Sequence, residues 1–217
     1  MQRTQSATRT KRVYDASGRR AQAARSRSAV LAAAERLFRA NGYAATTIAR
    51  IAAAAEVSVE TVYKAFGGKP GLVRALAGRG LAGQGVVPAE QRSDAMRLAE
   101  RDPHRIIANW GTLGAEVAPR IAPILLLVRA AAATDPEMSA LLDELSAERL
   151  RRMTTNARHL YEAGSLRRGV TLADAVDILY TYSSPELFEL LVFQRGWTPD
   201  RYGGFIADAM RSALLPR

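Results

Sequence analysis

Residues 46–69, TTIARIAAAAEVSVETVYKAFGGK, carry the pattern that decides the fold. Ile48 and Ile51 recur at helical spacing after a Thr-Thr pair that can cap a helix start, which predicts a short helix with one apolar face. Ser58 is placed to cap a second helix, whose apolar residues include Val62. Two short helices joined by a tight turn are typical of the helix-turn-helix motif, in which the N-terminal residues of the second helix enter the DNA major groove.

The predicted DNA contacts come from the Thr pair and first helix, from the start and outer face of the second helix, and from the loop that follows. Lys69 lies beside Pro70, which suits the first residue of a further helix, and a helix N-terminus with a lysine beside it favours a phosphate. The alternative for this lysine is an ordinary solvated loop residue. The predicted DNA contacts are Thr46, Thr47, Arg50, Ser58, Val59, Glu60, Thr61, Tyr63, Lys64 and Lys69.

Residues 42–72 resemble the DNA-binding segment of the TetR family of transcriptional regulators. The family pattern is an aromatic residue after Gly, a Thr pair, Ile-Ala, Val-Ser, a Tyr on the recognition helix, then Phe, a small loop and Lys. Glu60 departs from it, since many members have Gly or Pro there. The matching residues are Gly42, Tyr43, Thr46, Thr47, Ile51, Ala52, Val57, Ser58, Tyr63, Phe66 and Lys69.

The resemblance implies an all-α protein with an N-terminal three-helix DNA-binding unit and a larger helical domain for ligand binding and dimerisation. It also implies a repressor that binds a palindromic DNA operator as a homodimer and is released by a small-molecule effector. The sequence pattern predicts a flexible basic arm over residues 1–18, the helix-turn-helix domain over 19–80 and the helical domain over 81–217. The arm either follows the DNA backbone or is an untethered tail.

The net positive charge is concentrated in the first third of the chain. Residues 1–80 carry 15 Lys and Arg against 4 Asp and Glu, whereas residues 81–217 carry 16 against 17. A basic field confined to the segment with the helix-turn-helix pattern attracts phosphate backbones. The nearly neutral remainder favours a ligand-responsive regulator over the alternative, a non-specific DNA-packaging protein without a ligand.

Composition also bears on other classes of protein: disulfide-linked proteins, enzymes, metal-binding proteins and membrane proteins. With 217 residues and 48% hydrophobic content the chain can bury a substantial core, and the absence of cysteine excludes disulfides and thiolate sites. His104 and His159 form no metal-spaced or nucleophilic motif, so we expect neither an enzyme nor a metal or cofactor site. The N-terminus resembles no secretory signal and the apolar run IAPILLLV from Ile121 is short, which favours a cytoplasmic protein without membrane contact.

Outside the helix-turn-helix pair, the sequence pattern also predicts helices. We expect helices over about 19–40, 70–79, 89–101, 103–134 with a break or bend near Pro119 and Pro123, 136–163, 172–195 and 199–215, and a Gly-rich linker over about 78–88.

The last two predicted helices carry more apolar surface than one helix pair near a chain end needs, which favours a four-helix interface between two subunits. The alternative is that these residues complete the core of the monomer. The predicted interface residues are Leu187, Leu190, Leu191, Phe205, Ile206, Met210 and Leu214. The predicted ligand-pocket residues, each of which could instead be simple core, are Trp110, Leu113, Leu126, Met153, Tyr161, Tyr180 and Phe188.

Overall fold

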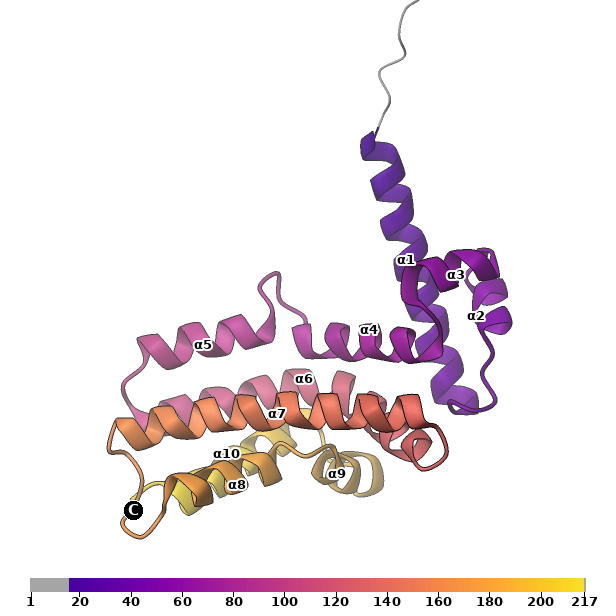
Figure 1. The fold of residues 1–217 in the computed structure, drawn as a ribbon. Coiled ribbons are helices and arrows are strands. Elements are labelled where there is room, and N and C mark those ends of the chain that lie inside the picture. The colour runs from indigo at the N-terminus through magenta and orange to yellow at the C-terminus, as the bar shows by residue number, and fades with distance from the viewer. Residues whose placement is uncertain (1–15, 217) are drawn as a thin grey trace, which may run out of the picture.

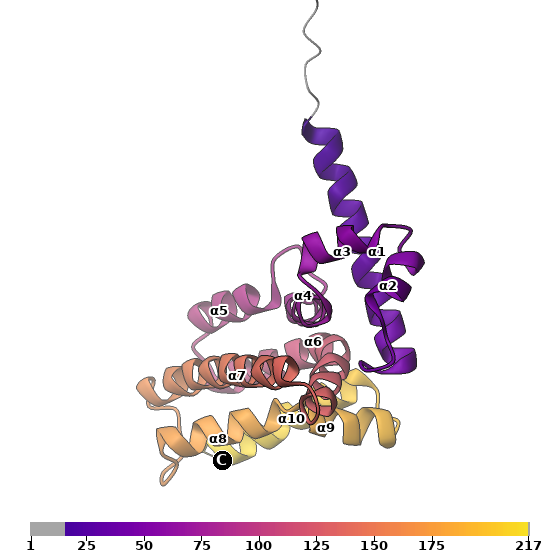
Figure 2. The ribbon, with the colours of Figure 1, turned by 45° about the vertical axis from the view of Figure 1, so that its right-hand side comes forward.

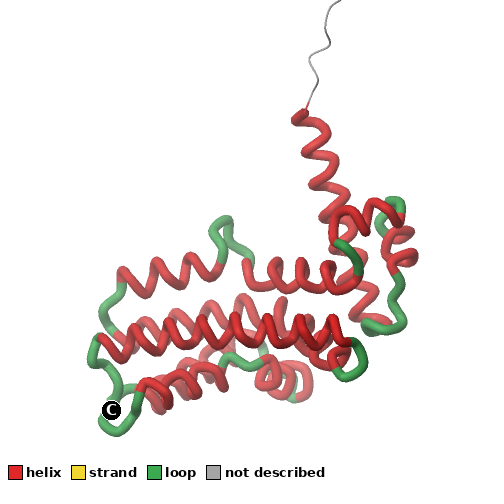
Figure 3. Tube along the Cα trace, in the orientation of Figure 1, coloured by secondary structure: helices red, strands yellow, loops and turns green. Residues whose placement is uncertain are grey.

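A computed structural model describes residues 16–216, and within that range the chain is helical and has no strand (Figures 1 and 3). The predicted arm lies outside the described residues except for positions 16–18, which already belong to the first helix. The helices are α1 (Ala16–Asn41), α2 (Ile48–Ala54), α3 (Val59–Phe66), α4 (Lys69–Ala82), α5 (Ala89–Ala99), α6 (Pro103–Ala132), α7 (Pro136–Glu162), α8 (Leu172–Tyr182), α9 (Pro185–Phe188), the π-helix η1 (Glu189–Gln194) and α10 (Pro199–Leu214).

Local capping signals define α2 and α3 as the sequence predicts. The Thr47 hydroxyl accepts a hydrogen bond from the Arg50 backbone N–H at 3.2 Å, and the Ser58 hydroxyl accepts one from the Thr61 N–H at 3.2 Å. At the other end, Gly67 adopts φ 76°, which ends α3 in the left-handed conformation that glycine accommodates without strain. The helix-turn-helix pair is therefore defined by side chains close to it in sequence.

The first three helices form one compact unit around buried apolar side chains. Val30 and Phe38 of α1 pack with Ile51 of α2 and Val62 of α3, and all four side chains are at most 1% exposed. Figure 1 shows this unit at one end of the molecule, with the N-terminal part of α1 projecting away from it. The core of this unit orients α3 relative to the rest of the chain.

Helix α4 joins this unit to the larger helical domain. Leu72 and Leu76 of α4 belong to the same apolar core as Ile121 and Ile124 of α6, so that core is continuous across the predicted domain boundary at residue 80. Figure 2 shows α4 lying against α6, below α1 and α3. The prediction that the linker starts at residue 78 is wrong, because α4 continues to Ala82.

Helix α6 is the central helix of the larger domain. It continues through Pro119 and Pro123, so of the predicted break or bend there is no break. By length and composition alone the helix could cross a membrane, which the short apolar run at Ile121 did not suggest. In the fold, however, α4, α5, α7, α9 and α10 pack around it, as expected of the core helix of a bundle.

The predicted helix over 172–195 is wrong in its continuity, because the chain forms three elements there. Helix α8 ends at Tyr182, and Ser184 then caps α9 by accepting a hydrogen bond from the Leu187 N–H at 3.4 Å. Pro185 disfavours helical geometry at the residue before it, so the chain must restart. The π-helix η1 follows α9 directly.

Helices α6 and α10 cross at very short range through two glycines. A Cβ atom added to Gly203 would lie 2.5 Å from the Gly111 carbonyl oxygen and 2.8 Å from the Ala115 Cβ, and one added to Gly111 would lie 2.5 Å from the Gly203 carbonyl oxygen. No side chain larger than hydrogen fits at either position unless the helices move apart.

Candidate nucleic-acid interface

The outer faces of α2 and α3 form an exposed, largely polar surface. Tyr63 is 53% exposed although it is aromatic, which leaves both its ring and its hydroxyl available to a partner. We call this surface the α2–α3 face. Its residues, all among the predicted DNA contacts and all exposed, are Thr47, Arg50, Ser58, Glu60, Thr61, Tyr63 and Lys64.

Three of the predicted contacts do not belong to this face: Thr46, Val59 and Lys69. Thr46 is fully buried, and its hydroxyl lies 2.7 Å from the Gly42 carbonyl oxygen and 3.2 Å from that of Leu37. Val59 is partly buried and packs against the core of the DNA-binding unit. The structure corrects the prediction for the Thr46 side chain, which is buried and holds the start of α2 in place. Val59 stays partly exposed, and its contact with DNA stays a prediction.

Lys69 has a structural contact that the sequence did not suggest. Its Nζ donates a hydrogen bond to the Tyr43 carbonyl oxygen at 2.9 Å and lies 4.1 Å from the centre of the Tyr43 ring. Burial raises the pKa of Tyr43, and the nearby charge of Asp135 raises it further. Lys69 therefore fastens the start of α4 to the turn before α2, and its contact with a phosphate stays a prediction.

Arg27 is a candidate that sequence reasoning did not single out. Its guanidinium donates to the Ala65 carbonyl oxygen at 2.9 Å and lies 4.3 Å from the centre of the Phe66 ring, at the end of α3. It lines a shallow hollow together with Tyr63 and Lys64. Because Arg27 precedes buried Val30 by three residues, helical spacing alone indicates that it faces α3.

Glu60 brings a negative charge to the first turn of α3. A hydrogen bond from its own backbone N–H and one from the Ser58 hydroxyl lower the pKa of this carboxyl, so it is ionised at neutral pH. A carboxylate in the major groove repels phosphates but accepts a hydrogen bond from the cytosine N4 amino group. The charge of Glu60 is therefore unsuited to the DNA backbone, and its contact with a base stays a prediction.

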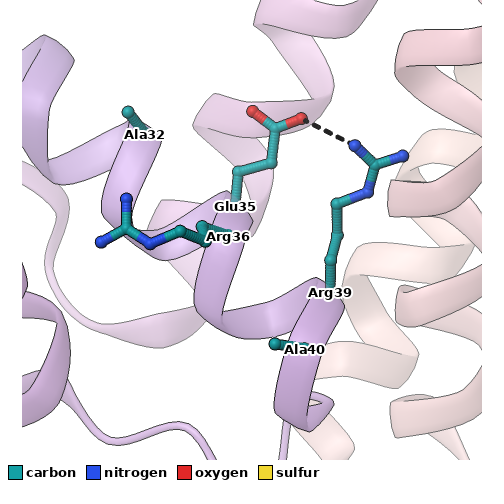
Figure 4. Close-up of a pocket in the computed structure, with 5 residues that line it drawn as sticks. All are labelled: Ala32, Glu35, Arg36, Arg39 and Ala40. Atoms are coloured by element: carbon teal, nitrogen blue, oxygen red, sulfur yellow. Dashed lines mark ion pairs between the residues drawn. The ribbon is translucent and has the colours of Figure 1, made fainter.

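A second shallow hollow lies on α1 and is not an enclosed pocket (Figure 4). All of its lining residues come from that one helix. Within it the Glu35 carboxylate pairs with Arg39 at 3.9 Å, and the same carboxylate also pairs with Arg79 of α4. This arrangement ties α1 to α4. The lining residues are Ala32, Glu35, Arg36, Arg39 and Ala40.

The predicted ligand-pocket residues divide by burial. Trp110 and Phe188 are buried in the core of the larger domain, and Phe188 packs edge-on against Phe193 and Tyr202. Tyr161 is 53% exposed, so the prediction that it lines an interior pocket is wrong. The remaining predicted residues are partly buried: Leu113, Leu126, Met153 and Tyr180.

The predicted interface residues also fall into buried, partly buried and exposed groups. Ile206, Met210 and Leu214 are buried in the core of their own chain, which is the monomer-core alternative for these three. Leu190 and Phe205 are 47% and 40% exposed. Leu187 and Leu191 are partly buried against the same core. The outward apolar surface is thus smaller than the sequence predicts.

The capped pair of α2 and α3, braced by α1 and exposing a polar outer face, defines a helix-turn-helix DNA-binding protein. Residues 30–76 match the bacterial regulatory proteins of the tetR family. The match covers most of the DNA-binding unit, so the chain is similar to the tetR family over this segment. A search of curated proteins finds no match.

Solved structures with the same fold support the architecture over most of the chain. The SmeT complex with triclosan has a TM-score of 0.70 and 22% identity and covers 88% of this chain and 92% of that chain. NalD, a secondary repressor of the MexAB-OprM multidrug efflux pump in Pseudomonas aeruginosa, has a TM-score of 0.68 and 22% identity and covers 89% and 98%. A putative regulator from Saccharomonospora viridis in complex with choline has a TM-score of 0.65 and 18% identity and covers 89% and 100%.

Proposed function

We propose that this protein is a ligand-responsive repressor that binds a palindromic operator as a homodimer and releases it when a small molecule enters the larger helical domain. The observation that carries the proposal is the exposed α2–α3 face, held on a core that continues through α4 into α6. The solved structures of similar fold include a repressor of an efflux pump and complexes with triclosan and with choline. The two complexes with small molecules support a small-molecule response here.

The connection between the two parts of the molecule supports coupling between ligand and DNA. A Cβ atom on Gly80 would lie 3.2 Å from the Arg120 carbonyl oxygen, so the end of α4 lies directly on the backbone of α6. The Arg74 Nε of α4 donates to the Glu144 carboxylate of α7 at 3.2 Å. A ligand that moves α6 or α7 would therefore move α4 and the DNA-binding unit attached to it, and spoil the simultaneous docking of two recognition helices.

A second copy of this chain is the proposed partner of an apolar patch on η1 and α10. We call Leu190, Phe193 and Phe205 the C-terminal patch; they are 47%, 50% and 40% exposed. Trp197 packs edge-on against Phe205 at 5.5 Å, which holds that ring in place. Exposed large apolar side chains of this kind favour a protein interface.

Replacing Leu190 with arginine should convert the dimer into a folded monomer, because the new charge would be buried without a partner in the interface. Leu150→Arg is the matched control, since Leu150 is 45% exposed but lies on α7 outside the patch. Sedimentation velocity distinguishes the species. A folded Leu190→Arg variant that remains dimeric would show that subunits associate through another surface.

The alternative function, a DNA-packaging protein, differs from a repressor in sequence preference. Selecting bound duplexes from a random pool with the wild-type protein should enrich an inverted repeat whose half-sites lie about one helical turn or a multiple apart. A packaging protein would enrich no motif. The charge difference between the two parts of the chain favours the first result, because packaging needs basic surface over the whole particle.

A further inference from the structure

Polar side chains face each other between α5 and α7. On each helix three of them follow the spacing i, i+4, i+7, which places them on one face. We call them the α5–α7 seam. Its members are Glu90, Asp94 and Arg97 of α5 and Arg152, Asn156 and His159 of α7.

Charged side chains join the two helices across this seam. Arg152 donates to the Asp94 carboxylate at 2.9 Å and to the Glu90 backbone oxygen at 3.2 Å. Arg97 donates to the same Asp94 carboxylate at 3.2 Å. The buried residues of α5 itself are small, Ala89 and Ser93. A polar molecule entering this seam would therefore displace few large apolar contacts.

Two buried polar atoms in the seam have no hydrogen-bond partner among the residues that the structure describes. They are the Nε donor of Arg97 and the Oδ1 acceptor of Asn156, and Asn156 as a whole is only 5% exposed. Native proteins pair nearly all buried polar groups, because an unpaired one loses its bonds to water without replacement. The donor on α5 and the acceptor on α7 are thus each open to a bound molecule.

The sheltered part of the seam carries excess positive charge. The Arg97 and Arg152 side chains are 15% and 18% exposed, whereas that of Asp94 is 38% exposed and that of Glu90 is 64% exposed. Although burial raises the pKa of Asp94, hydrogen bonds from the two arginines lower it below its ordinary value, so Asp94 is ionised. Burial, and then the charge of Arg97, lower the pKa of His159 and keep it neutral. Both guanidinium groups thus pair with Asp94, and Arg152 also pairs with the Glu90 carboxylate at 3.4 Å, but both carboxylates are more exposed than the two arginines.

Building on the proposed ligand response, we propose that the α5–α7 seam binds a small carboxylate that also carries a hydroxyl or N–H donor. Its carboxylate accepts a hydrogen bond from Arg97 Nε, and its donor group bonds to Asn156 Oδ1. The apolar remainder lies toward Met153 and Leu160, which flank Asn156 on α7 and belong to the core of the larger domain. Arg97 supplies the counter-ion for the carboxylate of such a ligand.

Isothermal calorimetry of the full-length protein with three matched probes tests the chemistry. The probe 2-hydroxybenzoate has both groups, benzoate lacks the donor, and 2-hydroxybenzamide lacks the charge. We expect 2-hydroxybenzoate to bind about 10-fold or more tightly than either of the others. Aliphatic hydroxy acids, lactate and malate, extend the panel to other shapes. If no hydroxy acid binds below about 10 mM, a concentration that corresponds to negligible affinity, the seam holds water only and the proposal is wrong.

Variants locate the site. Arg97→Met should weaken 2-hydroxybenzoate binding about 10- to 100-fold, whereas Arg158→Met, the same change at an exposed position of α7, should leave it unchanged. Asn156→Leu should remove the preference for 2-hydroxybenzoate over benzoate and raise the melting temperature of the ligand-free protein, because an unpaired acceptor is lost. Equal binding by wild type, Arg97→Met and Asn156→Leu would place the probe elsewhere and overturn the proposal.

Measuring operator binding in parallel separates this proposal from the proposed function. Arg97→Met should bind the selected duplex as the wild type does but no longer release it when 2-hydroxybenzoate is added. If the probe binds the seam without releasing DNA, the proposed binding site is supported and the proposal that a ligand releases the operator is wrong. If the wild type binds a specific duplex but no hydroxy acid, the seam proposal alone fails.

Discussion

A variant carrying Arg50→Glu and Lys64→Glu should lose about 100-fold or more of its affinity for the selected duplex at physiological salt. Both side chains are exposed on the α2–α3 face, so each change replaces an attraction to phosphate with a repulsion. The loss should be largest at low salt, where screening is weakest. Fluorescence anisotropy with a labelled duplex measures it across a salt series.

Overall charge is a competing explanation for such a loss, and a matched variant removes it. Arg158→Glu with Arg168→Glu changes the net charge by the same amount, at exposed positions on α7 and in the loop before α8. We expect this control to retain most of the wild-type affinity. Equal losses in the two double variants would mean that the long-range field of the protein, and not the α2–α3 face, determines binding.

The largest effect on stability should come from Gly203→Leu. The new side chain has no space between α6 and α10, since its Cβ atom alone would lie 2.5 Å from the Gly111 carbonyl oxygen. Separating the helices would expose the buried side chains of Tyr202 and Ile206. We expect the free energy of unfolding to fall by about 3–5 kcal/mol, at or above the upper end for overpacked cores.

Gly204→Leu is the control for this variant because the two glycines are neighbours on α10. A Cβ atom on Gly204 meets nothing within 4 Å, and leucine favours a helix more than glycine does, by up to about 1 kcal/mol. Urea unfolding at one fixed protein concentration should therefore give a lower midpoint for Gly203→Leu and an unchanged or higher midpoint for Gly204→Leu. Equal midpoints would contradict the close crossing of α6 and α10.

Signals close in sequence predicted the DNA-binding unit well. Thr47 and Ser58 cap the helices that follow them, and Gly67 ends α3, because each of these effects depends on a few neighbouring residues. The errors arise where tertiary contacts decide. Thr46 is equivalent to Thr47 in a sequence pattern, yet only the packing of α1 against α2 shows that its hydroxyl is buried.

Glycine and proline were the most ambiguous signals. The Gly-rich stretch 78–88 predicted a linker, but Gly80 lies inside α4 because only a small residue allows that helix to approach the α6 backbone. Pro119 predicted a break or bend, yet α6 continues through it, whereas Pro185 does mark a helix restart, at a position where the sequence analysis predicted continuity.

The ligand-binding part was the least predictable from sequence. Apolar composition does not distinguish a buried Phe188 from an exposed Tyr161, because both lie on helices with mixed faces. Arg97 and Asn156 are far apart in the chain and carry no motif. Their shared property, an unpaired polar atom in the interior, exists only once α5 has packed opposite α7.

The central claim is that the α2–α3 face of a dimer reads a DNA sequence. The most direct test compares the affinity of the wild-type protein for the selected inverted repeat with its affinity for a scrambled duplex of the same length and composition, at physiological salt. A sequence-reading repressor should bind the inverted repeat about 1,000-fold or more tightly. Equal affinity for the two duplexes would contradict the account and support a DNA-packaging protein.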